Sequence, residues 1–322
     1  VVQSLGADIL RLWAASIDYR YEISASKEIL TRTSETYRRI RNTARFLLAN
    51  MHGFDPAQHL VAAADMLMLD RWIVDRVRVL QTEIVDAYET YQFHLVIQKL
   101  HQFCVADLGG FYLDIIKDRQ YTMATNSRGR RSAQTALFHI AHALVRWMAP
   151  ILSFTAEEIW QYLPGQREES VFLTTWYEAL APLPANAEMN AAFWEKVRAV
   201  REAVNKEIEN QRNAGKIGSA LEAEVSLYCG PHLKEWLDKL GDELRFVLIT
   251  SSIKIIPEHS GPLDMVVTDV PGLALKIEPT TQPKCERCWH RRSDVGVDPA
   301  YPGICGRCVE NIAGPGEVRN YA

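Results

Sequence analysis

Two Cys-x-x-Cys turns near the C-terminal end are the sequence feature that most constrains how this chain folds. Cys285 and Cys288 form the first turn, Cys305 and Cys308 form the second, and residues 289–304 separate them. Each turn places two thiolates on one side of a tight loop, and two such turns supply the four sulfur ligands of a tetrahedral zinc site. The spacing therefore predicts one Zn²⁺ ion held by four cysteines. Because this ligand set leaves no coordination position for water, we expect the zinc to be structural.

Other uses of the four cysteines stay open: two disulfides, an iron–sulfur cluster or four unrelated thiols. The sequence opens without the basic and apolar segments of a secretory signal, so we expect no secretory leader, and it has no apolar run of the roughly 20 residues that cross a bilayer. We therefore expect a cytoplasmic protein with no membrane partner. In the cytoplasm, cysteine thiols bind metal more often than they form disulfides. Because so short a tail cannot bury a sufficient core, metal removal is expected to unfold the tail and leave the rest standing. Cys104 and Cys229, in apolar contexts, are predicted to be buried structural thiols.

The first half of the chain, from about residue 5 to residue 163, has the apolar spacing of consecutive amphipathic helices. The expected helices include residues 69–80, 88–113 and 135–148, with breaks at 53–56, at 126–129 and at Pro150. A further helix is predicted to start with a capping box, with Thr155 as N-cap and Glu158 three residues later. This half is therefore predicted to be an all-α bundle.

The second half changes character after a Pro- and Ala-rich linker at residues 181–184. A long polar helix over 190–213 is followed by short β-rich runs at 222–228, 245–256, 265–270 and 274–277, with a helix over 231–240. This order predicts a small α+β module before the cysteine-containing tail. We expect four parts: a connector (1–24), the all-α bundle (25–184), the long helix with the α+β module (185–280) and the zinc-binding domain (281–322).

Basic residues gather in a few places although the chain carries 36 Lys and Arg against 40 Asp and Glu, a net charge of −4. A nucleic acid would therefore have to be held by local patches. Arg38, Arg41 and Arg45 recur at i, i+3 and i+7, which places them on one helix face. A second cluster contains Lys117, Arg119, Arg128, Arg130 and Arg131, and a third, beside the cysteines, contains Lys284, Arg287, Trp289, His290, Arg291, Arg292 and Arg307. The alternative is that these are ordinary solvated surfaces, with Trp289 as a miniature core and not a base-stacking platform.

No catalytic constellation is found in the sequence. His139 and His142 resemble the His-x-Gly-His signature by which class I aminoacyl-tRNA synthetases bind ATP, but Ala141 stands where Gly is needed and the pair lies in a helical run. We expect both to be core or surface histidines. Gly-rich phosphate loops, a G-x-S-x-G elbow and a Lys-Met-Ser-Lys-Ser loop are all absent from the sequence.

Several segments, taken together and in order, resemble the C-terminal half of bacterial isoleucyl-tRNA synthetases. The matching segments are residues 5–13 with Asp18-Tyr19, 37–43 with 45–48, 70–72, 116–119 with Tyr121, 154–160, 217–223 and 285–290. The helical segments are also similar to those of valyl-, leucyl- and methionyl-tRNA synthetases, and the two cysteine turns narrow the resemblance to the isoleucyl enzymes. A similar zinc finger ends formamidopyrimidine-type DNA glycosylases, but those enzymes need an N-terminal Pro nucleophile and this chain offers Val1. A DNA-repair glycosylase relative and a stand-alone zinc-ribbon module that binds protein are therefore kept as alternatives.

The resemblance implies a mainly α fold, in which a helical-bundle anticodon-binding domain precedes a small α+β module and a four-cysteine zinc ribbon. It further implies a monomeric tRNA-recognition fragment that binds isoleucine tRNA and its own N-terminal catalytic domain. The full enzyme would join isoleucine to its tRNA with ATP through an aminoacyl-adenylate, and this chain alone would be inactive. Asp8, Arg11 and Trp13 would be structural. The predicted RNA contacts are Arg38, Arg41, Arg45, Lys117, Arg119, Trp289, Arg291 and Arg292.

Overall fold

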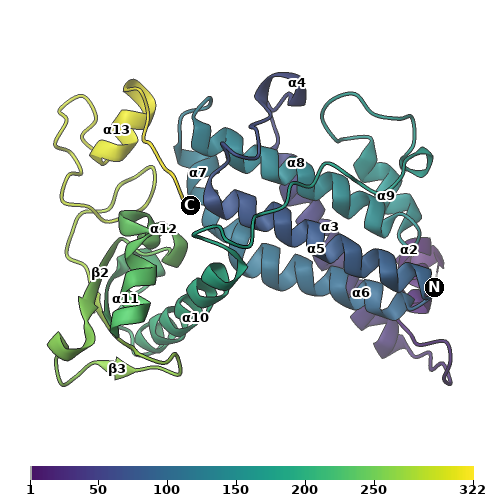
Figure 1. Ribbon diagram of the computed structural model, residues 1–322, viewed down its shortest axis with the longest axis horizontal. Helices are drawn as coiled ribbons and strands as arrows, with labels where there is room; N and C mark the ends of the chain where they lie inside the picture. Colours follow the sequence, from purple (N-terminus) through teal and green to yellow (C-terminus); the bar gives the residue numbers. More distant parts are fainter. Residues whose placement is uncertain (1) are drawn as a thin grey trace. The chain divides into compact units, whose positions relative to one another are not determined.

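The computed structural model describes residues 2–322, which separate into two compact units. The first contains the described residues up to Met66 with Asp70–Asp114 and Arg131–Leu183, and the second contains Leu67–Leu69, Ile115–Arg130 and Pro184–Ala322. Among these residues the first unit has helices and no strand, whereas the second combines helices with a four-stranded sheet and the tail (Figure 1). The predicted mainly α fold class is confirmed. No helix within residues 2–322 is both long enough and apolar enough to cross a membrane.

The helices of the first unit form where apolar side chains recur every three or four residues. Those lying wholly or mainly in this unit are α1 (Val2–Leu5), α2 (Ala7–Ala15), α3 (Lys27–Asn50), α4 (Pro56–His59), α5 (Met68–Glu89), α6 (Phe93–Gln102), η1 (Phe103–Tyr112), α8 (Arg128–Met148), α9 (Ser153–Trp160) and η2 (Val171–Leu173). In α3, the side chain of Ser26 caps the first turn by accepting a hydrogen bond from the Ile29 N–H at 3.1 Å. Ile40, Ala44 and Leu47 then bury one face of α3, which leaves the other face for charged residues.

The helix expected over residues 88–113 is not one element. The chain breaks after α5 because Tyr91 takes the left-handed conformation, with a φ of 56°, before α6 begins. The next segment, η1, is a π-helix, and α7 (Leu113–Thr122) follows it. Gly109 and Gly110 lie in η1, where an added Cβ would approach a backbone carbonyl oxygen to 3.2 Å and 3.3 Å respectively. This close approach of the backbone favours glycine in the π-helical turn.

The predicted capping box is wrong, because α9 begins at Ser153, two residues before Thr155. The backbone N–H and the hydroxyl of Thr155 donate to Oδ2 of Asp8 at 2.7 Å and 2.6 Å. Glu158 accepts hydrogen bonds from both terminal guanidinium nitrogens of Arg41, each at 2.7 Å. The first turn of α9 is therefore capped by a carboxylate from α2, far away in the sequence, and not by its own residues.

The second unit is built around a long helix and a small sheet. Its main elements are α10 (Ala191–Asn213), β1 (Ala223–Cys229), α11 (Pro231–Asp238), α12 (Leu244–Leu248), β2 (Ser252–Pro257), β3 (Val266–Val267), β4 (Leu273–Pro279) and α13 (Gly306–Ala313), with short turns η3 (Ala220–Glu222), η4 (Gly241–Glu243) and η5 (Glu258–Ser260). The strand order is β2-β1-β4-β3, with β1 parallel to β2 and antiparallel to β4. This unit also contains residues 115–130, which bring most of α7 into it.

The strand expected over residues 245–256 begins later than predicted. Residues 244–248 form α12 and all five are buried. A short, continuous apolar run fits a buried helix as well as a buried strand, so spacing alone does not separate the two. Ile249, in the left-handed conformation with a φ of 56°, ends α12, and β2 starts at Ser252.

Candidate metal centre and nucleic-acid interface

The four cysteines predicted to bind zinc lie together and are buried. Their sulfur atoms all lie within 4.8 Å of one another, and the Sγ–Sγ distances are 3.7 Å for Cys285–Cys308 and for Cys288–Cys305. A tetrahedral site with Zn–S bonds of about 2.3 Å has edges of about 3.8 Å. Both the donor set and the spacing therefore fit one Zn²⁺ ion with four sulfur ligands. Among residues 2–322 this is the one cluster of His, Cys, Asp or Glu identified as able to hold a metal.

Local backbone hydrogen bonds form the two turns that present the sulfurs. In the first turn, the Trp289 N–H donates to the carbonyl of Cys285 at 2.9 Å, and the Cys285 N–H donates to the carbonyl of His290 at 2.9 Å. In the second, the Cys308 N–H donates to the carbonyl of Cys305 at 2.9 Å, where α13 begins. The Cys305 N–H also points at Sγ of Cys285, at 3.4 Å. Such N–H donors stabilise thiolate sulfur, the form that binds metal.

The cysteines are themselves the core of this tail. The apolar residues packed against them are Val295 and Ile304, both only partly buried. So small a core gives little hydrophobic stabilisation, which supports the prediction that zinc stabilises this part of the chain. The other two cysteines are buried elsewhere, and burial raises the pKa of the Cys104 thiol to about 12 and that of Cys229 to about 11. Their burial agrees with the prediction of structural thiols.

Trp289 lies on the surface and is not the core of the tail. Its side chain is 61% exposed, and its backbone has a φ of 66°, in the left-handed region. The ammonium nitrogen of Lys284 lies 5.0 Å from the centroid of the indole ring. An exposed indole beside a cation can stack on a base while the cation meets a phosphate. Of the two alternatives for Trp289, the structure favours the stacking platform.

Most arginines beside the cysteines are engaged within the protein. Arg287 donates to the carbonyl of Thr122 at 2.5 Å, and Arg307 pairs with Asp118 through two hydrogen bonds of 2.7 Å and 2.8 Å. Arg307 is therefore unavailable to RNA. The two predicted RNA contacts in this region are partly exposed: Arg291 pairs with Glu222 at 3.0 Å, and Arg292 lies 3.7 Å from Asp294. A phosphate would have to compete with these carboxylates.

The predicted stripe on α3 lies on the surface of the helix. Arg38 and Arg45 are exposed, and neither has an ion-pair partner within residues 2–322. Arg41 lies between them, with its side chain 36% exposed and paired to Glu158. The hydrogen bond from Arg41 to Glu158 raises the pKa of Arg41. Arg38 and Arg45 are thus better placed than Arg41 to meet a phosphate.

The second predicted cluster does not form one surface. Lys117 is exposed on α7, whereas Arg119 is fully buried, with 0% exposure, and donates to the carbonyl of Gly129 at 3.1 Å. The prediction that Arg119 contacts RNA is therefore wrong. Arg131 is also buried and donates to the carbonyl of Gly53 at 3.0 Å and to Gln134 at 2.7 Å. These two arginines satisfy backbone and amide oxygens inside the protein.

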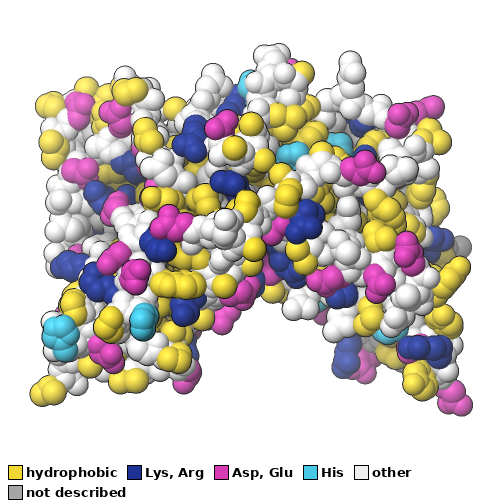
Figure 2. All heavy atoms as spheres, in the orientation of Figure 1, with side chains coloured by type: hydrophobic (Ala, Val, Ile, Leu, Met, Phe, Trp, Pro, Cys, Tyr) yellow, Lys and Arg dark blue, Asp and Glu magenta, His cyan; other side chains and the backbone are white. Residues whose placement is uncertain are grey.

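The surface drawn in Figure 2 agrees with a mildly acidic protein that has local basic patches. Lys and Arg side chains are interspersed with Asp and Glu over this face. No single basic field covers it, as the net charge of −4 leads one to expect.

His139 and His142 are packed among aromatic rings of the first unit. His142 lies 5.2 Å from the ring of Tyr177 in a stacked arrangement, and Nδ1 of His139 lies 2.8 Å from the Tyr177 hydroxyl. Burial lowers the pKa of His139 to about 4 and that of His142 to about 3. Both are therefore neutral core histidines near pH 7, as expected from the missing Gly of the ATP signature.

Two protein families match this chain, one over much of its helical part and one over its cysteine-containing tail. A family described as "Anticodon-binding domain of tRNA ligase" matches residues 70–227, and one described as "Zinc finger found in FPG and IleRS" matches residues 282–311. The second match contains all four cysteines.

Comparison with whole sequences gives matches along the full chain. An Isoleucine--tRNA ligase from Azotobacter vinelandii is 61% identical over 322 residues, which is 100% of this chain and 34% of that protein. One from Methylococcus capsulatus is 59% identical over 321 residues, again 100% of this chain and 34% of the relative. The chain thus spans about one third of the length of the relatives it matches. A solved LeuRS–tRNA–LeuAMS complex from Agrobacterium radiobacter matches 52% of this chain and 19% of its own chain, with 16% sequence identity and a TM-score of 0.38. This similarity is too distant to support an argument.

Proposed function

We propose that this chain is the part of an isoleucine–tRNA ligase that recognises tRNA, and its similarity to such ligases over its whole length is the observation that carries the proposal. The match to an anticodon-binding domain supports the helical part as the reader of the anticodon stem and loop. The zinc-finger family is described for two kinds of protein, FPG and IleRS, so by itself it does not separate a ligase from a glycosylase. The sequence identity to the ligases also covers the residues outside the tail, which favours a ligase. A stand-alone zinc adaptor would not need the helical bundle.

The exposed residues suit a single-stranded RNA loop. Such loops present unstacked bases, which proteins read by stacking and edge hydrogen bonds, while Arg and Lys bind the phosphates. In the proposal Arg38, Arg45 and Lys117 bind phosphates, and Trp289 stacks on a base. Arg41, Arg291 and Arg292 contribute when a phosphate displaces the carboxylates beside them. Arg119, which is buried, is given no RNA contact in the proposal.

The remaining functions belong to the whole ligase. The parts of the relatives that lie outside this chain would bind ATP and isoleucine and form the aminoacyl-adenylate, with this chain alone inactive. The partners would be isoleucine tRNA and the catalytic domain of the same polypeptide, in a cytoplasmic monomer. The zinc ion would hold the tail in shape and take no part in the chemistry, because four sulfur ligands leave no open position.

The experiment is a salt titration of tRNA binding with the double variant Arg38→Glu/Arg45→Glu. Each phosphate contact contributes about 0.7 to the slope of log affinity against log salt for single strands. The variant is therefore expected to bind isoleucine tRNA more weakly at low salt, with a slope smaller by about 1.4. Arg32→Glu is the control, because Arg32 lies on the same helix, about 120° and about 140° around its axis from Arg38 and Arg45, and pairs with Glu28. Equal weakening by both variants, or by neither, would reject the assignment of this helix face.

A further inference from the structure

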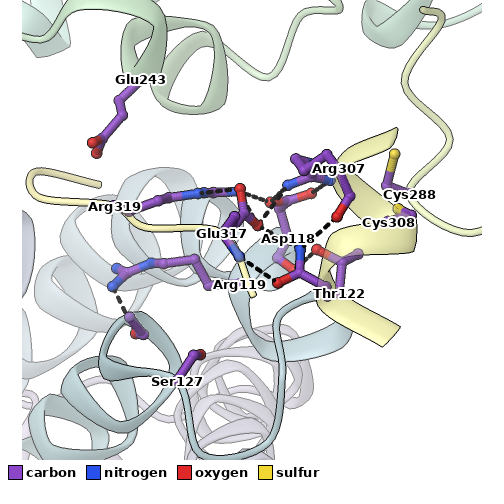
Figure 3. A network of polar contacts seen from close by, with 12 residues as sticks. Asp118, Arg119, Thr122, Ser127, Glu243, Cys288, Arg307, Cys308, Glu317 and Arg319 are labelled. Atoms are coloured by element: carbon purple, nitrogen blue, oxygen red, sulfur yellow. Dashed lines mark hydrogen bonds and ion pairs between the residues drawn. The ribbon is translucent and has the colours of Figure 1, made fainter. Parts of the chain in front are cut away.

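Asp118 of α7 lies where three separate stretches of the C-terminal region meet (Figure 3). Its carboxylate accepts two parallel hydrogen bonds from Arg307, at 2.7 Å and 2.8 Å, and a further one from Arg319. Nε2 of His290 lies 3.8 Å from Oδ1 of the same carboxylate. The guanidinium side chains are only 10% exposed for Arg307 and 1% exposed for Arg319. Removing this carboxylate is costly, because the two buried guanidinium groups are then left with Glu317 as the one carboxylate they share.

The three partners of Asp118 come from different parts of the tail. His290 lies two residues after Cys288, directly beside the first cysteine turn, and Arg307 lies between the two cysteines of the second turn. Arg319 belongs to the last stretch of the chain, residues 317–322, called here the C-terminal strap. One carboxylate on α7 therefore contacts both cysteine turns and the strap.

The strap is held at several other points. Glu317 pairs with Arg307 at 3.1 Å. The backbone N–H groups of residues 320, 321 and 322 all donate to the carboxylate of Glu243, at 2.8 Å, 2.9 Å and 2.8 Å. The Leu69 N–H donates to the carbonyl of Tyr321 at 2.8 Å. These contacts make the strap a fixed part of the second unit, so Arg319 reaches Asp118 from a defined position.

An aromatic ring completes the cluster around Asp118. The guanidinium carbon of Arg319 lies 3.4 Å from the centroid of the Phe246 ring, and that of Arg307 lies 5.0 Å from it. Two cations, Arg307 and Arg319, thus face two carboxylates, Asp118 and Glu317, over one aromatic face. This arrangement fixes the direction of both guanidinium groups by stacking as well as by ion pairing.

We propose that Asp118 is a positioning residue for the zinc-binding tail: it fixes both cysteine turns and the C-terminal strap on α7, so that zinc retention and the docking of the tail are coupled. The coupling acts through Arg307, because this side chain leaves the backbone between two of the sulfur ligands. Moving Arg307 disturbs the second turn, and losing the ion disorders the turn from which Arg307 extends. Groups outside the ligand shell commonly alter metal affinity by about 10- to 100-fold. By linkage, the zinc ion must then stabilise the strap by the same coupling.

The first experiment measures how fast the zinc-loaded chain releases zinc to a colorimetric chelator. Asp118→Asn is expected to release zinc at least about tenfold faster than the unmodified chain. Asp269→Asn is the control, because Asp269 makes an exposed ion pair with Lys206 elsewhere in the second unit. Arg307→Lys keeps a cation but loses one of the two parallel hydrogen bonds, so an intermediate rate is expected. If Asp118→Asn does not fold, the rate of zinc release from Arg307→Lys decides. The proposal is overturned if the variants that fold release zinc at the same rate as Asp269→Asn.

The second experiment tests the coupling from the other side, without any substitution. Hydrogen exchange of the amides of residues 320–322 is measured in the zinc-loaded chain and after complete removal of zinc. The proposal requires these amides to exchange faster without zinc, although none of them is in either cysteine turn. If the amides of the strap are equally protected from exchange with and without zinc, the proposal is overturned, whatever the chain's affinity for tRNA.

Discussion

Replacing Asp8 tests whether α2 is a structural part of the first unit. The Asp8 carboxylate is buried and accepts two short hydrogen bonds from Thr155 and a longer one of 3.4 Å from the Phe154 N–H. These donors belong to the first turn of α9, where a negative charge also meets the positive end of the helix. Hydrogen bonds to a charged group contribute about 1.5–3 kcal/mol each, so we expect Asp8→Ala to cost about 3–4 kcal/mol and Asp8→Asn about half as much.

The assay is thermal unfolding followed by circular dichroism, with hydrogen exchange to locate the change. For a domain of this size 1 kcal/mol corresponds to about 2–4 °C, so a cost of about 3–4 kcal/mol for Asp8→Ala should lower the melting temperature of the first unit by about 6–16 °C. Asp18→Asn is the control, because Asp18 pairs with Arg20 on the surface at 2.6 Å, and such pairs contribute little. The reasoning would be refuted if the Asp8→Ala protein had the same melting temperature as Asp18→Asn. It would also be refuted if protection from hydrogen exchange were lost outside α2 and α9.

Two further predictions concern pH and metal. The pKa values of His139 and His142 in the folded protein, about 4 and about 3, lie below the unfolded value of 6.5. Their neutral state therefore stabilises the fold above pH 6.5, and this stabilisation is lost as the pH falls toward 4, by about 1.4 kcal/mol per pH unit for each histidine. Urea unfolding at several pH values measures this loss of stability. A His139→Gln/His142→Gln protein whose stability has the same pH dependence would contradict the prediction. Complete chelation of zinc should make residues 281–322 sensitive to protease while the helical signal of the first unit is kept, and a tail that stays resistant would show that its stability does not depend on metal.

The features that the sequence predicts well depend on residues that are close together along the chain. Four sulfur ligands at fixed spacing indicate a zinc site because the two turns are local, and the structure brings the sulfurs within 4.8 Å of one another. The spacing of Ile40, Ala44 and Leu47 predicts the buried face of α3 for the same reason, since one helix turn sets it. Arg38 and Arg45 follow from that face as exposed residues.

The features that the sequence does not predict depend on contacts over long separations. Lys117, Asp118 and Arg119 are consecutive charged residues on α7, but the first is exposed, the second binds the tail and the third is buried. Their different roles are set by which distant segments cover each side of α7, among them the strap that carries Arg319. Asp8 and Thr155 are likewise far apart in the sequence, so the local pattern indicates a capping box where a distant carboxylate acts instead.

The most direct test of the tRNA-recognition proposal is an equilibrium competition with the zinc-loaded chain. Labelled isoleucine tRNA is bound at low salt and displaced by unlabelled isoleucine tRNA, by other tRNAs and by duplex DNA of equal nucleotide content. The proposal predicts that isoleucine tRNA displaces the label at the lowest concentration. Equal displacement by every competitor, or preference for duplex DNA, would contradict it.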